Sequence, residues 1–144
     1  DVYKRQDNVR VNMVNVLEAT NPARNVSSNG QRCEWSKPVI TNMIDEPSRT
    51  CVAALEDGRI YYLGNPIKGS RDVLVIGLSN DGLKFTKAYA VRYNPPPRRW
   101  DGKYKNIGFQ YPSAMWIGEY LYVTYSVNKE DIQISKVRIS DLIS

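Results

Sequence analysis

Short runs of apolar and β-branched residues, each closed by glycine, proline, asparagine or aspartate, recur along this sequence of 144 residues. This spacing is typical of strands joined by tight turns and lacks the periodicity of long helices. The aromatic residues, ten Tyr and three Trp against two Phe, also suit strands with one solvated edge. We therefore predict an all-β fold of about one domain.

Four consecutive antiparallel strands are predicted in the middle of the chain. Gly58 can adopt the positive φ angle of a tight hairpin turn, and the turn Asn80-Asp81-Gly82 reverses the chain in the same way. The strands that these turns join are 50–55 with 59–65, and 72–79 with 83–92.

A three-stranded unit is predicted after a long loop. The loop, residues 93–110, contains three consecutive prolines and cannot pair continuously in a sheet. Loops of this length in compact domains often line a site. The strands predicted after it are 112–117, 120–126 and 131–139, with Gly118-Glu119 as one turn. Upstream, strands are predicted at 9–18, 23–28 and 34–41.

Small meanders of this kind need other sheets to cover their faces. β-Propellers solve this by stacking meanders as blades around an axis. We predict a partial β-propeller with two to three antiparallel blades, formed by residues 8–144 as the carboxy-terminal part of a longer protein. Residues 1–7 do not join the strand pattern and are interpreted as a non-native or disordered leader.

Composition excludes several classes of function. The sequence has no histidine, which rules out His-based triads and His-ligated zinc in this chain. Cys33 and Cys51 are too few for a metal knuckle, and spacing does not show whether they pair. We predict neither a metal nor another cofactor. The net charge of +5 mildly favours an anionic partner. No membrane span or apolar signal core is apparent, so localisation and oligomeric state stay open, with a secreted or periplasmic full-length protein as one expectation.

Two turns resemble the Asp-box S-x-D-x-G-x-T-W. One is Ser79-Asn80-Asp81-Gly82 with Phe85, and the other, more distant, is Ser27-Ser28-Asn29-Gly30 with Trp35. In that turn a carboxylate accepts backbone N–H groups and the closing aromatic residue packs between strands. The order of WSKPVITN, LEDGRIYYLGNP, SRDVLVIGLSNDGLKF and FQYPSAMWIGEYLYVTYSVNKEDIQISKV is similar to the last third of bacterial sialidase-like (BNR-repeat) propellers. The likeness covers residues 26–144.

The resemblance implies an exo-acting, retaining glycoside hydrolase. Arg71 matches the family arginine that binds a sugar carboxylate, for which a guanidinium supplies bidentate geometry. Tyr111 matches the nucleophile, since a neutral phenol approaches an anomeric centre that bears a carboxylate with less repulsion than Asp or Glu. We expect Pro112 to hold Tyr111 in extended geometry. The alternatives for these residues are an exposed Arg beside a turn and a packing Tyr.

Four further residues are candidates for substrate binding: Gln110 beside Tyr111, Lys105 in the long loop, and Lys129 with Glu130 in a turn. The last three could instead form a surface charge cluster. The acid/base Asp, the Glu that assists the tyrosine and the first clamp arginine would lie on earlier blades outside this chain, and the second clamp arginine has no clear match beyond Arg10 or Arg24.

The expected partner is an anionic glycan that carries a sialic-acid-like sugar or a uronic acid. A non-catalytic carbohydrate-binding propeller and a polysaccharide lyase, or another glycosidase, on the same architecture remain alternatives. Nucleic-acid binding ranks last. The basic residues that would support it, Arg98, Arg99, Lys103 and Lys105, alternate with Trp100 and Tyr104, but the cluster is short and isolated.

Overall fold

A computed structural model describes residues 9–12, 39–44 and 48–143. Strands dominate these residues, and α2 (Ile139–Ile143), which the sequence did not predict, is a single short helix among them. The strands are β1 (Val9–Asn12), β2 (Val39–Ile44), β3 (Cys51–Ala54), β4 (Ile60–Gly64), β5 (Leu74–Ser79), β6 (Phe85–Arg92), β7 (Phe109–Ile117), β8 (Tyr120–Val127) and β9 (Asp131–Arg138). The predicted all-β fold is confirmed.

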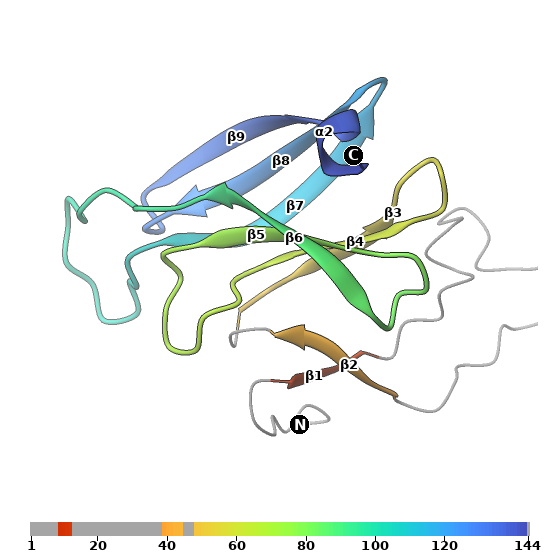
Figure 1. Cartoon of the computed structure of the whole chain (residues 1–144). Coiled ribbons are helices and arrows are strands. Elements are labelled where there is room, and N and C mark those ends of the chain that lie inside the picture. Colours follow the sequence, from red (N-terminus) through yellow and green to blue (C-terminus); the bar gives the residue numbers. More distant parts are fainter. Residues whose placement is uncertain (1–8, 13–38, 45–47, 144) are drawn as a thin grey trace, which may run out of the picture.

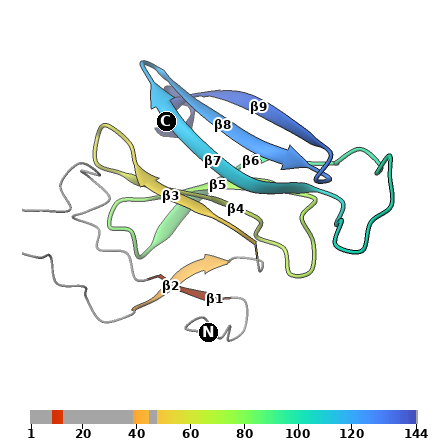
Figure 2. The same ribbon diagram turned by 180° about the vertical axis from the view of Figure 1, so that it is seen from behind.

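The strands form three layers of antiparallel sheet (Figures 1 and 2). The sheet β3-β4-β5-β6 lies in the middle, with the pair β1-β2 on one side and the sheet β7-β8-β9 on the other. Every strand in the two larger sheets pairs with its neighbour in sequence, as in a meander. Blades arranged around a closed axis remain a prediction.

The middle sheet contains the four predicted strands. Gly58 has the positive φ of 86° that its hairpin requires, and Gly82, in the turn before β6, has φ 74°. Along β4 every residue is buried, because both faces of this strand are covered by neighbouring layers.

The sheet β7-β8-β9 follows the long loop. Gly118 makes the turn between β7 and β8 with φ 56°. Strand β7 starts at Phe109, before the predicted start at Pro112, so the loop is shorter than predicted and ends at Gly108. A bulge between Gln110 and Ser113 lets the strand continue through Pro112, which cannot donate a ladder hydrogen bond.

The core lies between the two larger sheets. Leu63, Leu74 and Ile76 come from the middle sheet, and Leu121 and Val123 of β8 meet them; all five are fully buried. Alternation along β8 explains this arrangement, since every second residue faces the core. Burial of this apolar area is the main force that joins the sheets.

The outer face of β7-β8-β9 carries several exposed apolar side chains. Ile132 and Ile134 of β9 are 81% and 66% exposed, and Met115 of β7 is 63% exposed. Large exposed apolar side chains on one sheet face are typical of surfaces that bind another protein layer.

Several upstream predictions fall outside the described residues, among them the leader 1–7, the strand 23–28 and Cys33. Strand β1 confirms the start of the predicted strand 9–18, and β2 begins later than the predicted 34–41. Cys51 forms no disulfide with any described residue. In the described part of the chain, no helix is long and apolar enough to cross a membrane.

Candidate functional site

Loops gather at one end of the stacked sheets, where β4 leads into β5, β6 into β7 and β8 into β9 (Figure 1). Arg71 lies in the first of these loops and forms an isolated parallel bridge with Gly108 at the end of the second. The carbonyl of Arg71 accepts a hydrogen bond from the N–H of Phe109 at 2.8 Å. This bridge holds the Arg71 backbone against the first residues of β7.

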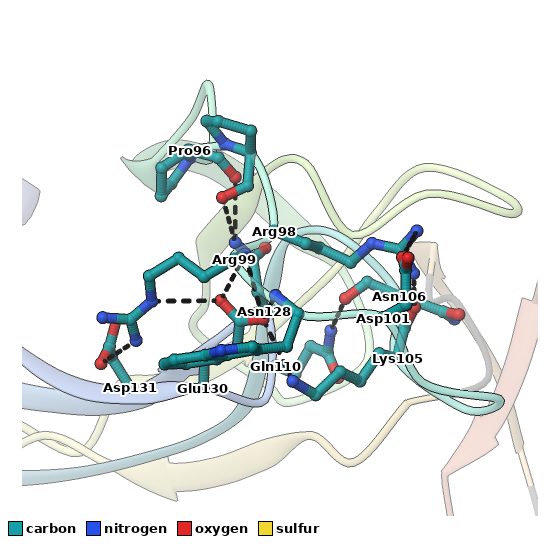
Figure 3. A network of polar contacts seen from close by, with 12 residues as sticks. Pro96, Arg98, Arg99, Asp101, Lys105, Asn106, Gln110, Asn128, Glu130 and Asp131 are labelled. Atoms are coloured by element: carbon teal, nitrogen blue, oxygen red, sulfur yellow. Dashed lines mark hydrogen bonds and ion pairs between the residues drawn. The ribbon is translucent and has the colours of Figure 1, made fainter.

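Gly108 is required at this junction. Its φ of 124° is rarely adopted by L-residues, and a Cβ atom there would lie 2.2 Å from the carbonyl oxygen of Arg71. Asn128, in the turn after β8, holds Gly108 from the other side: its Oδ1 accepts from Gly108 N, and its own N–H donates to Gly108 O, both at 2.8 Å. The Asn128 amide also donates to the carbonyl of Pro96 at 2.9 Å (Figure 3). One buried asparagine therefore joins the turn after β8 to both ends of the long loop.

The Arg71 side chain is held by Gln110. Arg71 Nη1 donates to Gln110 Oε1 at 2.8 Å. Gln110 Nε2 in turn donates to the carbonyl of Asn106 at 2.6 Å (Figure 3). The Gln110 side chain is completely buried. Both ends of this amide are thus hydrogen-bonded to protein groups.

Tyr111 follows directly and points to the surface, with 44% of the residue exposed. Its φ is 55°, so the extended geometry expected before Pro112 is wrong. Tyr111 sits in the bulge of β7, where the ladder is interrupted and the backbone can turn into the left-handed region. Such strain in a non-glycine residue is found most often at functional sites.

Two cations lie near the Tyr111 phenol. The Lys129 ammonium has the larger effect and the Arg71 guanidinium a smaller one, and together they lower the pKa of Tyr111 below its ordinary 10.0 despite partial burial. Lys129 Nζ lies 5.7 Å from the centre of the Tyr111 ring. Lys129 and Asn128 both have positive φ, as in the tight turn of a type I′ hairpin. That turn directs Lys129 over Tyr111.

Lys105 and Glu130 pair with each other beside this group. Lys105 Nζ lies 3.1 Å from the carboxylate of Glu130, whose side chain is 2% exposed. Burial raises the pKa of Glu130, but backbone N–H donors from Arg99 and Trp100 and the Lys105 ammonium outweigh burial and hold this pKa at about 2. Figure 3 shows this carboxylate between the long loop and β9. Glu130 is therefore ionised and anchors the loop.

A hollow of about 410 Å³ adjoins Arg71 on the side of the long loop, with Arg98 and Asn106 among its lining residues. The hollow, Arg71 and Tyr111 share one end of the sheets. Among the described residues, no cluster of three or more His, Cys, Asp or Glu side chains could hold a metal ion.

The turn that resembles an Asp-box lies at the opposite end of the middle sheet (Figures 1 and 2). The carboxylate of Asp81 accepts backbone N–H groups of Leu83 and Lys84, both at 2.8 Å. The ring of Phe85 packs edge to face with Tyr62. These contacts stabilise the turn, and its membership of the repeat family stays a prediction.

Comparison with known proteins gives one informative match. No family model matches the sequence, and no curated protein matches it either. A solved structure described as "Sialidase" matches with a TM-score of 0.64 and 33% sequence identity over 78% of this chain. This chain has a sialidase-like fold. It spans only 11% of the length of that sialidase.

Within this sialidase-like fold, the sequence predicted Arg71, Tyr111, Gln110 and Lys129, and the structure brings all four together. It missed Asn128 and Asn65. The amide of Asn65 donates to the carbonyls of Val73 and Phe109 at 2.8 and 2.9 Å and so joins both sheets below the site. These roles depend on contacts between segments that are distant in the sequence, so no local sequence signal marks either asparagine.

Proposed function

We propose that this end of the sialidase-like fold is part of a glycoside hydrolase site for an anionic sugar. In this proposal Arg71 binds the sugar carboxylate and Tyr111 is the nucleophile of a retaining, exo-acting reaction. The observation that supports it is the placement of two cations, Arg71 and Lys129, where both lower the pKa of the exposed Tyr111 phenol. A phenol with a lowered pKa is a better nucleophile at neutral pH.

The reaction follows from these roles. The oxygen of Tyr111 attacks the anomeric carbon as the glycosidic C–O bond breaks, and the departing oxygen takes a proton from an acid. Water then cleaves the tyrosyl–sugar bond and restores the phenol. The resemblance assigns the acid to an Asp, and the assisting base to a Glu, on segments outside this chain. Lys129 stabilises the phenolate while the charge of Arg71 is shared with the substrate carboxylate.

A polysaccharide lyase is the second candidate function. Its support is that both groups that lower the pKa of Tyr111 are cations, an arrangement that also suits a tyrosinate base. In this reaction Tyr111 would remove the proton α to a uronic-acid carboxylate while Arg71 and Lys129 neutralise that carboxylate. Elimination of the group at the β position would leave an unsaturated sugar.

The deciding experiment compares Tyr111→Phe and Arg71→Lys variants of the protein that carries this chain. Each is assayed for release of a fluorescent aglycone from a sialoside and for ultraviolet absorption of an unsaturated uronate. We expect Tyr111→Phe to lose turnover and keep sugar affinity, and Arg71→Lys to lose affinity. Met115→Ala, on the outer sheet face, is the control.

Each result supports one of the candidate functions. Aglycone release that depends on Tyr111 supports the hydrolase, and an absorbing product supports the lyase. Sugar binding that depends on Arg71 without either product indicates a carbohydrate-binding module. Normal hydrolysis by Tyr111→Phe would overturn the nucleophile assignment.

A further inference from the structure

Two aromatic side chains project from the long loop beside the candidate site. Trp100 is 59% exposed and Tyr104 is 73% exposed. The carbonyl of Tyr104 accepts a hydrogen bond from Lys129 Nζ, the same ammonium that lies over Tyr111. The loop and the Arg71–Tyr111 site therefore form one continuous surface.

The segment that carries Trp100 is held by a buried charge. The Glu130 carboxylate accepts the backbone N–H of Trp100 at 3.0 Å and the N–H of Arg99 at 3.1 Å, and it pairs with Lys105 (Figure 3). A carboxylate that is 2% exposed and fully hydrogen-bonded fixes the loop backbone strongly. Glu130 thus holds the backbone of Trp100, and the indole stays exposed.

Cations pack over the indole as well. The guanidinium carbon of Arg99 lies 4.5 Å, and Lys105 Nζ lies 5.4 Å, from the ring centre. Such contacts restrict the ring while more than half of Trp100 remains open to solvent. A rigid, exposed aromatic ring beside a polar pocket is a typical surface for binding a flat or ring-shaped ligand at low entropic cost.

The charges around the ring favour a sugar over a nucleic acid. Arg99 pairs with Asp131 at 2.6 Å, Lys105 with Glu130 at 3.1 Å, and Arg98 with Asp101 at 3.3 Å. Binding of a phosphate backbone needs cations that contact successive phosphates. Here three of the four cations in the loop are paired with carboxylates, and the fourth, Lys103, packs over the Tyr104 ring. The C–H face of a sugar needs only the aromatic ring and polar groups at its rim.

We infer that Trp100, held by Glu130, is a stacking subsite for a second sugar ring of the same anionic glycan. The inference depends on the proposed function, because it takes the ring whose carboxylate Arg71 binds as the first one. Trp100 then determines how strongly the protein prefers oligosaccharides to single sugars. Tyr104 lies in the same loop and is also exposed, so its ring extends this surface.

Binding to matched monomers and oligomers tests this inference. The probes are galacturonic acid and its linear trimer, and N-acetylneuraminic acid and a sialyl trisaccharide, measured by calorimetry on the full chain. Truncation of an anchoring aromatic residue costs about tenfold or more in affinity, so Trp100→Ala should lower the ratio of trimer to monomer affinity by about that factor. Trp100→Phe should restore most of the ratio, and Met115→Ala should leave it unchanged.

Glu130→Gln provides the second arm. It keeps the size of the side chain but removes the charge that holds the loop, so the trimer preference should fall although Trp100 is intact. Thermal denaturation of each variant shows whether the fold is kept. Equal trimer and monomer affinities in the parent chain, an unchanged ratio in Trp100→Ala, or no binding to any probe would overturn the subsite.

The two proposals fail separately. If Arg71→Lys weakens the binding of every probe and Trp100→Ala leaves the ratio of trimer to monomer affinity unchanged, the carboxylate site is supported and the subsite is wrong. If Trp100→Ala lowers binding of the trimers while Arg71→Lys changes nothing, the carboxylate site is wrong and a stacking surface stands. Salt-sensitive binding of a single-stranded oligonucleotide that Trp100→Ala abolishes, with no sugar binding, would replace the glycan by a nucleic acid.

Discussion

The Nη1 atom of Arg71 donates a hydrogen bond at 2.8 Å to the Oε1 atom of Gln110, a side chain that is completely buried. Replacing Gln110 with Leu removes this acceptor and the bond to Asn106. We expect the free energy of unfolding to fall by about 1–3 kcal/mol, since buried partners lose their hydrogen bonds. Affinity for an anionic sugar should fall about tenfold or more because Arg71 is no longer aimed. Denaturant titration and calorimetry measure both, with exposed Gln133→Leu as the control.

Gly108→Ala should destabilise the protein more than Gly118→Ala. Both glycines have positive φ, which costs an L-residue about 1–2 kcal/mol, but only at Gly108 would the new Cβ meet a neighbouring carbonyl, at 2.2 Å. The space around Gly118 is open. Melting temperatures of the two variants test this difference, and equal losses would show that the Arg71–Gly108 bridge is not tight.

Lys129→Met should raise the pKa of Tyr111 toward 10, because the ammonium is the main group that lowers it. Arg71→Gln should raise the same pKa by a smaller amount. If the phenolate is the reactive form, the ascending limb of the pH–rate profile moves to higher pH in Lys129→Met. Nuclear magnetic resonance of labelled tyrosine follows the titration, with Tyr111→Phe to assign the signal. A lower pKa in Lys129→Met would contradict the placement of these groups.

Asp81 should make the protein sensitive to acid. Backbone N–H groups of Lys84 and Leu83, followed by the Ser79 hydroxyl, lower the pKa of Asp81 from 3.8 to about 2 in the folded chain. A folded-state pKa below the unfolded value stabilises the fold above pH 4, and this contribution is lost as the pH falls toward 2. Asp81→Ala should therefore melt earlier than the parent chain at pH 7, and the difference should shrink near pH 2. Gln133→Leu, which removes no ionisable group, should show no such convergence.

Local chemistry explains what could be predicted from the sequence. Hairpins at Gly58, Gly82 and Gly118 follow from the positive φ that each turn needs, and the strands follow from alternation between them. The two site residues Arg71 and Tyr111 followed from a resemblance to a family, not from spacing.

Contacts between distant segments explain what was missed. The bridge from residue 71 to residue 108 joins two loops. Local sequence patterns do not indicate a contact between residues so far apart in the chain. The left-handed backbone of Tyr111 depends on the bulge in β7, which local preference before proline does not indicate. The role of Asn128 depends on where the two ends of the long loop lie, and tertiary packing alone decides that.

The bridge that joins the Arg71 backbone to the start of β7 lies beside Gln110, whose side chain holds the Arg71 guanidinium. Mutations that loosen this junction should therefore reduce folding yield and ligand recognition together, so the two properties are selected jointly. The segment around Trp100 is different, because the carboxylates of Glu130 and Asp131 hold it and no bridge between the two larger sheets passes through it. Evolution or laboratory diversification could vary that segment to change glycan preference while the scaffold keeps its stability.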